Sequence, residues 1–461
     1  MTTLVKIYDR APVMVQSLML SAYGLRLRYL RYGAEQRAHL ADLRRSERLS
    51  APELRRLQLT RLEAVTRAAA RDVPFYRKRI PSGGVRSLEA LRDLPELTKQ
   101  AAQMAGRALV SSRFTATRLQ EVHTGGTTGT PLTVYCDRSA LQRNYAFFSR
   151  FREWTGIAAT HRAATFAGRT IVPPQRGAPF WRHNWASNVL LCSSYHIGPD
   201  TVDEYLDALA EFRPALIDTY PSSLAPLAHR ALVRGEERIR PTAIITSSET
   251  LLPEVRQEAQ AAFGCRVFDH YGAAEMAAFI TQCEVGSYHA NPEYGIVEIL
   301  ANGRPAQPGE CGEIVATGFV NDVMPFIRYA TGDLAVAGVP ECACGRAFPV
   351  IERIEGRRDD VIVTPEGRRI GRLDPIFKGV KGIHEARIVQ DAIDHVRVEV
   401  VPWTVLSAEE HAVLLAELRR RLGAAMRISI MAVGHLERTR GGKLRSVVNL
   451  LVPSGVASTG Q

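Results

Sequence analysis

The alternation of hydrophobic and polar positions divides the chain into three regions, of which the first is helical. Residues 36–49 carry apolar side chains at helical spacing. A second helix begins after Ser50, because Pro52 stands in its first turn and Glu53 completes a capping box. We therefore expect residues 1–82 to form a helical segment that packs on the core.

The second region, residues 83–356, alternates short apolar runs with helical patterns. The predicted strands are 162–166, 215–219, 242–246 and 265–268, and the predicted helices are 137–154, 202–212, 222–234 and 253–263. This alternation predicts βαβ units around a parallel sheet. From about residue 295 to 350 the pattern contains only strands and turns, which predicts a β subdomain within the core.

The third region, residues 357–461, has the pattern of a compact C-terminal domain. Strand patterns at 384–389 and 395–401 precede a helix, for which Ser407 and Glu410 supply a capping box, and a further strand pattern follows. The predicted fold class is therefore α/β: a large region of βαβ sheets with a β subdomain, followed by a small α+β domain.

Composition supports a soluble enzyme. At 461 residues the chain exceeds one ordinary core, and 46% hydrophobic with 23% charged residues is typical of globular proteins. Seven scattered cysteines exclude a disulfide scaffold and favour the reducing cytoplasm. The net charge of +11 comes from arginines spread along the chain, which favours a basic enzyme with anionic substrates over a nucleic-acid-binding protein.

No apolar run reaches the roughly 18–20 residues that a membrane span needs. Residues 13–25 come nearest, but the run is short and contains Gln16, and Asp9 precedes it, which disfavours a secretory signal. We expect an amphipathic helix that lies on the protein body or binds weakly to a membrane surface.

A loop rich in glycine and threonine precedes the first strand pattern of the core. Residues 121–132, EVHTGGTTGTPL, contain three glycines and four threonines. Glycine lets backbone N–H groups approach oxyanions, and threonine hydroxyls can donate to them. No Gly-Lys-Ser/Thr closes the loop, so it is not a Walker A motif. By itself the stretch fits a phosphate cradle and a plain surface loop equally well.

Four other motifs could carry chemistry. Residues 269–275 (DHYGAAE) follow a strand and offer an aromatic ring for a purine and a carboxylate for a metal ion, and residues 247–250 (SSET) follow the neighbouring strand. Residues 328–333 (RYATGD) put an acid in a tight turn, where it could accept ribose hydroxyls. Residues 438–443 (RTRGGK) put a lysine on a flexible loop, where it could stabilise developing negative charge. Capped helix starts, turn acids and solvated lysines are the structural alternatives.

In this order, HTGGTTGTP, SSET, YGAAE, RYATGD, GRRDD and RTRGGK resemble the motifs of the adenylate-forming superfamily of acyl-CoA synthetases. The segment VPFYRKRI and an Ala-Cys-Gly-Arg sequence resemble its phenylacetate–CoA ligase and CapK-like capsule-biosynthesis branch. The likeness spans about residues 40–450. The chain departs from the superfamily pattern at Leu132, where a lysine is frequent, and in SSET, where a glycine-rich version is usual.

The resemblance implies a role for each matching residue. The implied roles are contacts to the ATP phosphates for Thr124, Thr127 and Thr128; the adenine side for Ser248, Glu249 and Thr250, with Tyr271 stacked on the ring; Mg²⁺ binding for Glu275; the ribose hydroxyls for Asp333, helped by Arg357; the domain hinge for Asp359; and a bridge between carboxylate and α-phosphate for Lys443.

The reaction implied by the resemblance joins a carboxylic acid to AMP, releases pyrophosphate, and passes the acyl group to coenzyme A after a rotation of the mobile last domain. An amine or a carrier-protein thiol as the acceptor, and nucleotidyl transfer alone, stay open. A non-catalytic scaffold on a degenerate ligase fold is the alternative from another class. The joint presence of Lys443, Glu275 and Asp333 argues against the scaffold. The acid and the oligomeric state are not specified by the sequence.

Two positions are candidates for contact with the acid. Tyr220 in DTYPSS, with aromatic side chains from residues 145–185, is placed at the acyl pocket from its position along the chain. His123, just before the glycine-rich loop, could face the acyl carboxylate, with a structural histidine as the alternative.

Cys283 and His289 precede Cys342 and Cys344, and the two pairs flank the predicted β subdomain. Three cysteines and one histidine form a complete tetrahedral zinc set, and with no open position the ion would be structural. The set also resembles residues of the capsule-biosynthesis branch. Four unrelated cytosolic side chains are the alternative, since C-x-C is tighter than the usual knuckle.

Overall fold

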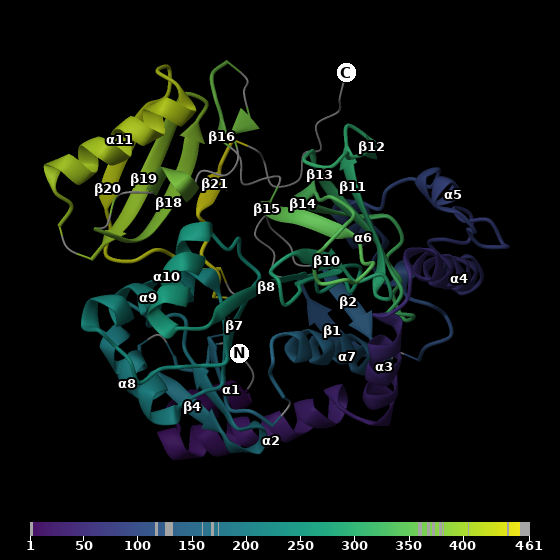
Figure 1. The fold of residues 1–461 in the computed structure, drawn as a ribbon, viewed down its shortest axis with the longest axis horizontal. Helices are drawn as coiled ribbons and strands as arrows, with labels where there is room; N and C mark the ends of the chain where they lie inside the picture. Colours follow the sequence, from purple (N-terminus) through teal and green to yellow (C-terminus); the bar gives the residue numbers. More distant parts are fainter. Residues whose placement is uncertain are drawn as a thin grey trace.

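The computed structural model describes residues 3–115, 119–124, 132–158, 160–166, 170–173, 175–357, 362–366, 369–370, 374–377, 380, 382–403, 405–439 and 442–451. Figure 1 shows a large body built on one long sheet and a smaller C-terminal body of strands and one helix. Thr127, Thr128 and Asp359 lie outside the described residues.

The large sheet has 13 strands in the order β12-β11-β13-β14-β15-β10-β9-β8-β7-β6-β3-β5-β4. Its strands are β3 (Ala163–Phe166), β4 (Trp181–Asn184), β5 (Val189–Cys192), β6 (Leu216–Thr219), β7 (Ala243–Ser247), β8 (Arg266–Gly272), β9 (Phe279–Gln282), β10 (Tyr288–Ala290), β11 (Gly295–Ala301), β12 (Arg304–Pro305), β13 (Cys311–Gly318), β14 (Tyr329–Ala337) and β15 (Val350–Arg357). Strands β5, β3, β6, β7 and β8 pair in parallel, as the βαβ pattern predicts. The strands between 295 and 350 extend this same sheet by antiparallel pairing, which needs no helical crossover.

Helices cover both faces of the parallel strands, because successive side chains of each strand point to opposite faces. On one face α7 (Arg138–Trp154) packs with Leu216, Ala243 and Phe268. On the other, α8 (Val202–Phe212), α9 (Pro221–Arg234) and α10 (Pro253–Phe263) pack on alternate residues of the same strands. The three helices lie within a residue of their predicted ranges.

The N-terminal helices wrap the large body. They are α1 (Thr3–Arg10), α2 (Val13–Arg31), α3 (Ala34–Ser46), α4 (Ala51–Asp72), α5 (Leu88–Arg92) and α6 (Lys99–Ala105), with short 3-10 turns at Gly106–Leu109 and Trp185–Ser187. The predicted capping box is confirmed, since Ser50 N–H donates to Glu53 Oε2 at 2.8 Å. Helix α3 ends at Ser46, before the predicted residue 49.

The C-terminal body is a four-stranded sheet in the order β20-β19-β18-β21 with a helix packed on it. Its elements are β18 (Ile383–Ala392), β19 (His395–Pro402), α11 (Ala408–Leu422), β20 (Arg427–Ala432) and β21 (Val447–Asn449), preceded by the β16 (Ile362–Val363) and β17 (Arg369–Ile370) pair and a 3-10 turn at Asp374–Phe377. The predicted capping box of Ser407 and Glu410 is present. Strand β21 was not predicted, and neither were β4 and β5.

Two motif residues predicted in irregular backbone lie in strands instead. Asp333 is in β14 rather than in a tight turn, and Arg357 ends β15 of the large sheet rather than opening the C-terminal region. The two residues are register partners. Two glycines of these motifs distort the strands instead of ending them. Gly332 and Gly356 have φ angles of 74° and 102°, and the pairing register of β14 with β15 shifts between Leu334 and Ala335.

A buried ion pair ties the N-terminal helices to the sheet. Arg150 Nη1 on α7 lies 2.7 Å from Glu293 Oε1, and their side chains are 1% and 0% exposed. Arg150 Nη1 also donates to the carbonyl of Leu43 on α3 at 3.1 Å. The pair therefore fixes three segments that are distant in sequence.

We expect Arg150→Met to lower the free energy of unfolding by about 3–5 kcal/mol, because the buried carboxylate of Glu293 loses its direct ion-pair partner. The double variant Arg150→Met/Glu293→Gln should lose less, since no lone charge remains. Urea unfolding followed by tryptophan fluorescence measures both. A loss below about 1 kcal/mol in the single variant would contradict the prediction.

Candidate active site

The carboxyl ends of the parallel strands place a row of polar side chains under α7. Thr165 of β3 pairs with Asp218 of β6. Ser247 of β7 pairs with His270 of β8 two positions nearer the carboxyl ends of the strands, so all four side chains project to the same face. A cavity of about 370 Å³ opens there. Its lining includes the aromatic side chains of Tyr145, Phe148 and Phe279 and the polar side chains of Asn144, Asp218 and Tyr220.

Asp218 gives this cavity a titratable group. Burial raises the pKa of the Asp218 carboxyl, and Arg152 opposes the shift from 3.7 Å. The Asp218 side chain is 31% exposed, and it lines the cavity. Burial also lowers the pKa of His270 to about 4, so its ring is neutral at pH 7.

Tyr271, Asp333 and Arg357 meet at the end of β8. The Tyr271 hydroxyl donates to Asp333 Oδ2 at 2.7 Å, and Arg357 Nε lies 3.0 Å from Asp333 Oδ1. Both oxygens of Asp333 are thus oriented by neighbours from two other strands. The structure brings together three residues that the sequence motifs placed separately.

Glu275 lies in the segment that links β8 to β9. It is 8% exposed and accepts a hydrogen bond of 2.8 Å from the hydroxyl of Tyr329, which is 1% exposed. Tyr329 fixes one carboxylate oxygen, and within the described part of the chain the other oxygen makes no hydrogen bond. A buried carboxylate with one oxygen left over is a suitable ligand for Mg²⁺.

Glu249 joins the C-terminal body to the large body. Its carboxylate accepts from Ser222 N–H and from Leu444 N–H, both at 2.9 Å, although 195 positions separate Glu249 from Leu444. Arg438 Nη1 donates to Ser222 Oγ at 3.1 Å and pairs with Glu385. Burial raises the pKa of Glu249. These contacts dock the motif RTRGGK over the motif SSET.

Lys443 is held among the acids of the site. Its pKa is lowered by burial, and the charges of Glu249, Asp333 and Glu275 oppose that shift while Arg357 adds to it. Its carbonyl accepts from Thr439 N–H at 2.9 Å. The docked C-terminal body thus brings a cation to three carboxylates of the large body.

The strands that precede and follow the glycine-rich loop in sequence, β1 (Gln120–His123) and β2 (Thr133–Cys136), pair with each other in antiparallel orientation. Thr124 closes its base, because Leu132 N–H donates to Thr124 Oγ1 at 3.0 Å. His123 is exposed, and its Nδ1 lies 3.2 Å from Thr133 Oγ1. The strand predicted after the loop is confirmed as β2, and the strand before it, β1, was not predicted.

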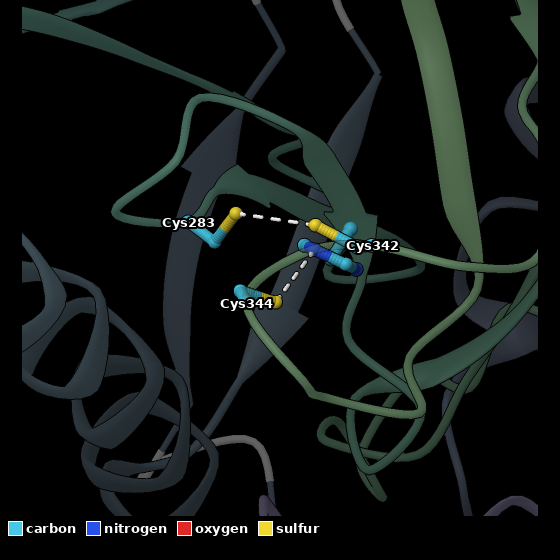
Figure 2. A group of neighbouring side chains, drawn as sticks. Cys283, Cys342 and Cys344 are labelled. Carbon is cyan, nitrogen blue, oxygen red and sulfur yellow. Dashed lines mark hydrogen bonds between the residues drawn. The ribbon is translucent and has the colours of Figure 1, made fainter.

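The four predicted zinc ligands converge in the structure. Their ligand atoms all lie within 4.8 Å of one another. Figure 2 shows Cys283, Cys342 and Cys344 pointing toward a common centre. Cys283 Sγ lies 3.8 Å from Cys342 Sγ, and Cys344 Sγ lies 3.4 Å from His289 Nε2. Zn–S bonds of about 2.3 Å in a tetrahedron separate two sulfurs by roughly 3.8 Å, so the residues fit zinc.

The orientation of the His289 imidazole suits metal binding. Its Nδ1 lies 3.2 Å from the carbonyl of Phe348, so Nδ1–H donates and Nε2 faces the cysteines. Burial lowers the pKa of His289, which favours the neutral ligand form. The other four cysteines are apart from this cluster.

Comparison with known proteins finds relatives that match almost the whole chain. Residues 362–450 match the model of the CapK C-terminal domain. Protein CapK of Staphylococcus aureus is 27% identical, with 96% of this chain and 98% of that protein covered. Phenylacetate-coenzyme A ligase of Thermus thermophilus is 23% identical, with 88% and 98% covered.

A solved structure, 2-hydroxyisobutyryl-CoA ligase in the postadenylation state in complex with R3-HIB-AMP, superposes with a TM-score of 0.68 at 22% identity. The match covers 89% of this chain and 92% of that one. The chain has the fold of the adenylate-forming ligases. The predicted resemblance and the predicted fold class are thereby confirmed.

Sequence reasoning did not single out several residues of the site. Tyr329 was inside the motif RYATGD and Arg438 inside RTRGGK, but only the last residue of each was given a role. Asp218 precedes Tyr220 by two residues, and the period-2 pattern of a strand could have placed it on the same face. Ser222 carried no recognisable signal, because its contact to Glu249 depends on the fold.

We expect Asp333→Asn to raise the KM for ATP by about 10- to 100-fold, since a charged hydrogen-bond acceptor contributes roughly 1.5–3 kcal/mol. Initial rates of pyrophosphate release against ATP concentration measure this. Asp394→Asn, which removes an exposed partner of Arg427 in the C-terminal body, is the matched control and should leave KM unchanged. An unaltered KM in Asp333→Asn would exclude Asp333 from the nucleotide site.

Proposed function

We propose that the protein activates a carboxylic acid with ATP, forming an acyl-adenylate and pyrophosphate, and then transfers the acyl group to coenzyme A as a thioester. The observation that carries the proposal is the docking of the segment that carries Lys443 on Glu249, where Leu444 N–H donates to the Glu249 carboxylate at 2.9 Å and the charges of Asp333 and Glu275 act on the lysine amine. Relatives and structural neighbours that are named acid–CoA ligases support the same general activity.

In the proposed first step, an oxygen of the substrate carboxylate attacks the α-phosphorus of ATP and the bond to pyrophosphate breaks. Lys443 would bridge the carboxylate and the α-phosphate and stabilise the negative charge that develops. Asp333 and Arg357 would hold the ribose, and Tyr271 the adenine. Mg²⁺ held by Glu275 would neutralise charge on the phosphates. The loop threonines, including Thr124, would contact the same phosphates.

In the proposed second step, the sulfur of coenzyme A attacks the acyl carbon and AMP leaves. Residues 357–461 would act as a lid domain that rotates between the two steps on a hinge at Asp359, whereas residues 1–82 and 83–356 would stay fixed as helical segment and core. An amine or a carrier protein as the acceptor is the second candidate, because the core alone does not select the nucleophile.

The substrate would occupy the cavity beside Tyr220, with His123 at its carboxylate end. An aromatic lining favours an aryl acid or an acyl chain. A structural zinc ion in the Cys283, His289, Cys342 and Cys344 cluster would fix the hairpins that carry Glu275 and β15.

The proposal is tested by a screen of aryl, fatty and amino acids for acid-dependent pyrophosphate release, with and without coenzyme A, followed by mass spectrometry of the products. We expect AMP formation with one class of acid, and an acyl-CoA when the thiol is present. Adenylate formation without transfer to coenzyme A would redirect the search to amines and carrier proteins. Absence of acid-dependent AMP formation across the screen would overturn the proposal.

A further inference from the structure

Helix α2 has its polar side turned inward. Gln16, Ser17 and Gly24 are buried against the segment that carries β4. Gln16 Oε1 accepts from Arg182 Nε at 2.5 Å, and the Ser17 and Ser21 hydroxyls accept from the N–H groups of His183 and Trp185 at 3.3 and 3.0 Å. Hydrogen bonds, rather than an apolar seam, therefore attach this helix to the protein.

The opposite side of α2 is an exposed apolar stripe, defined here as Met14, Leu18, Leu25 and Tyr29. These side chains are 63%, 55%, 58% and 62% exposed. Their spacing of four, seven and four residues keeps them on one face over about 22 Å of helix. These apolar residues do not contribute to the hydrophobic core, and polar side chains on the other side of the helix attach it to the protein.

Basic side chains flank the stripe. Arg26 and Arg28 are exposed on α2, and the guanidinium carbon of Arg138 lies 3.9 Å from the ring centroid of Tyr29. Residues 1–34 contain five lysines and arginines and a single acid, Asp9. An apolar stripe bordered by arginines is the pattern of a helix that lies in the interface of an anionic membrane.

We propose that α2 binds the surface of an anionic lipid bilayer, with the stripe inserted among the acyl chains and the arginines paired with lipid phosphates. No helix in the described chain is long and apolar enough to cross a bilayer. Figure 1 shows α2 along the edge of the large body that is remote from the C-terminal body. Binding there leaves the C-terminal body free to move.

A second copy of the chain fits this surface less well. Pairing two α2 stripes would bring arginines of one copy against arginines of the other, with only Asp9 of each copy available as a counter-charge in this segment. Desolvating like charges across an interface is unfavourable. A bilayer rich in phosphatidylserine supplies the opposite charge along the whole helix.

The test is sedimentation of the full-length protein with vesicles of phosphatidylcholine alone and of phosphatidylcholine with phosphatidylserine. We expect binding to the anionic vesicles only, weakening as salt is raised. Arg26→Gln/Arg28→Gln should reduce the partition coefficient about 30-fold, at about 1 kcal/mol per charge. Leu18→Gln/Leu25→Gln should reduce it at least about tenfold.

Met104→Gln is the matched control, because Met104 is 82% exposed and lies on α6, away from the stripe. It should bind vesicles as the unaltered protein does, and circular dichroism should show all variants folded. Lack of binding to anionic vesicles would overturn the proposal, as would equal binding to neutral vesicles. A dimer that Leu18→Gln dissociates in gel filtration, without vesicle binding, would assign the stripe to a second copy instead.

Discussion

Replacement of Lys443 by alanine should reduce ATP–pyrophosphate exchange by about 100- to 1,000-fold, the loss typical of one charge-stabilising group at a transition state. This loss follows from the position of Lys443. Lys443 is the cation that the C-terminal body brings to Glu249, Asp333 and Glu275, where the phosphates are proposed to lie. Exchange of labelled pyrophosphate into ATP, in the presence of the acid found by the screen, measures this step alone.

Two controls distinguish this role from a general effect. Arg420→Ala removes a cation that is 63% exposed on α11 and should leave exchange unchanged. Transfer of a supplied acyl-adenylate to coenzyme A should survive in Lys443→Ala, because the proposed role of the lysine ends with adenylation. Unchanged exchange in Lys443→Ala would remove this residue from the chemistry.

The dependence of activity on pH is a second test of the role of Lys443. Burial lowers the pKa of Lys443 below the ordinary 10.5. Since the proposed role needs the protonated amine, kcat/KM for ATP should fall with rising pH through a pKa lower than that of an exposed lysine. Lys443→Arg keeps its charge at high pH, so any activity that it retains should lack this alkaline limb.

The second large effect concerns the metal cluster. We expect about one zinc ion per chain, and removal of the ion by a chelator should lower the Tm by on the order of 5–10 °C, because a structural zinc contributes its binding energy to folding. Cys342→Ser should show the lowered Tm at the outset and no further change with chelator. Elemental analysis and thermal melts measure both quantities.

Cys311→Ser is the matched control for the metal site, since Cys311 is exposed on β13 and outside the cluster. It should keep the zinc ion and respond to chelator as the unaltered protein does. Full zinc content in Cys342→Ser, or a chain that is purified without zinc and is unaffected by chelator, would show the cluster to be four unligated side chains.

Local signals in the sequence were sufficient for most elements of the fold. Helices α8 and α10 agree with their predicted ranges, and α4 and α11 begin at their predicted caps, because caps and helical periodicity depend on neighbours within one or two turns. Strands β4 and β5 were missed. The run of β4 is polar at Arg182 and His183, which hydrogen-bond to Gln16 and Ser17 of α2 instead of packing in an apolar layer.

The candidate site was predicted as a set of residues but not as an arrangement. Motif order was enough to name Tyr271, Asp333 and Arg357 individually. Their contacts require β14 to pair with β15 and the Tyr271 hydroxyl to reach Asp333 from another strand. The residue pattern within one segment does not predict such contacts between segments. Asp333 was placed in a turn because Gly332 is a turn signal, whereas the glycine only distorts a continuous strand.

The sequence by itself determined the order of most helices and strands, the resemblance to adenylate-forming ligases, and the identity of the four candidate metal ligands. Only the tertiary structure decided that these ligands converge, that the segment carrying Lys443 docks on Glu249, and that the apolar side of α2 faces outward. The reason is physical. Periodicity and capping are set by residues a few positions apart, whereas these contacts join segments about 60 to 195 positions apart, and sheet register and domain docking fix them.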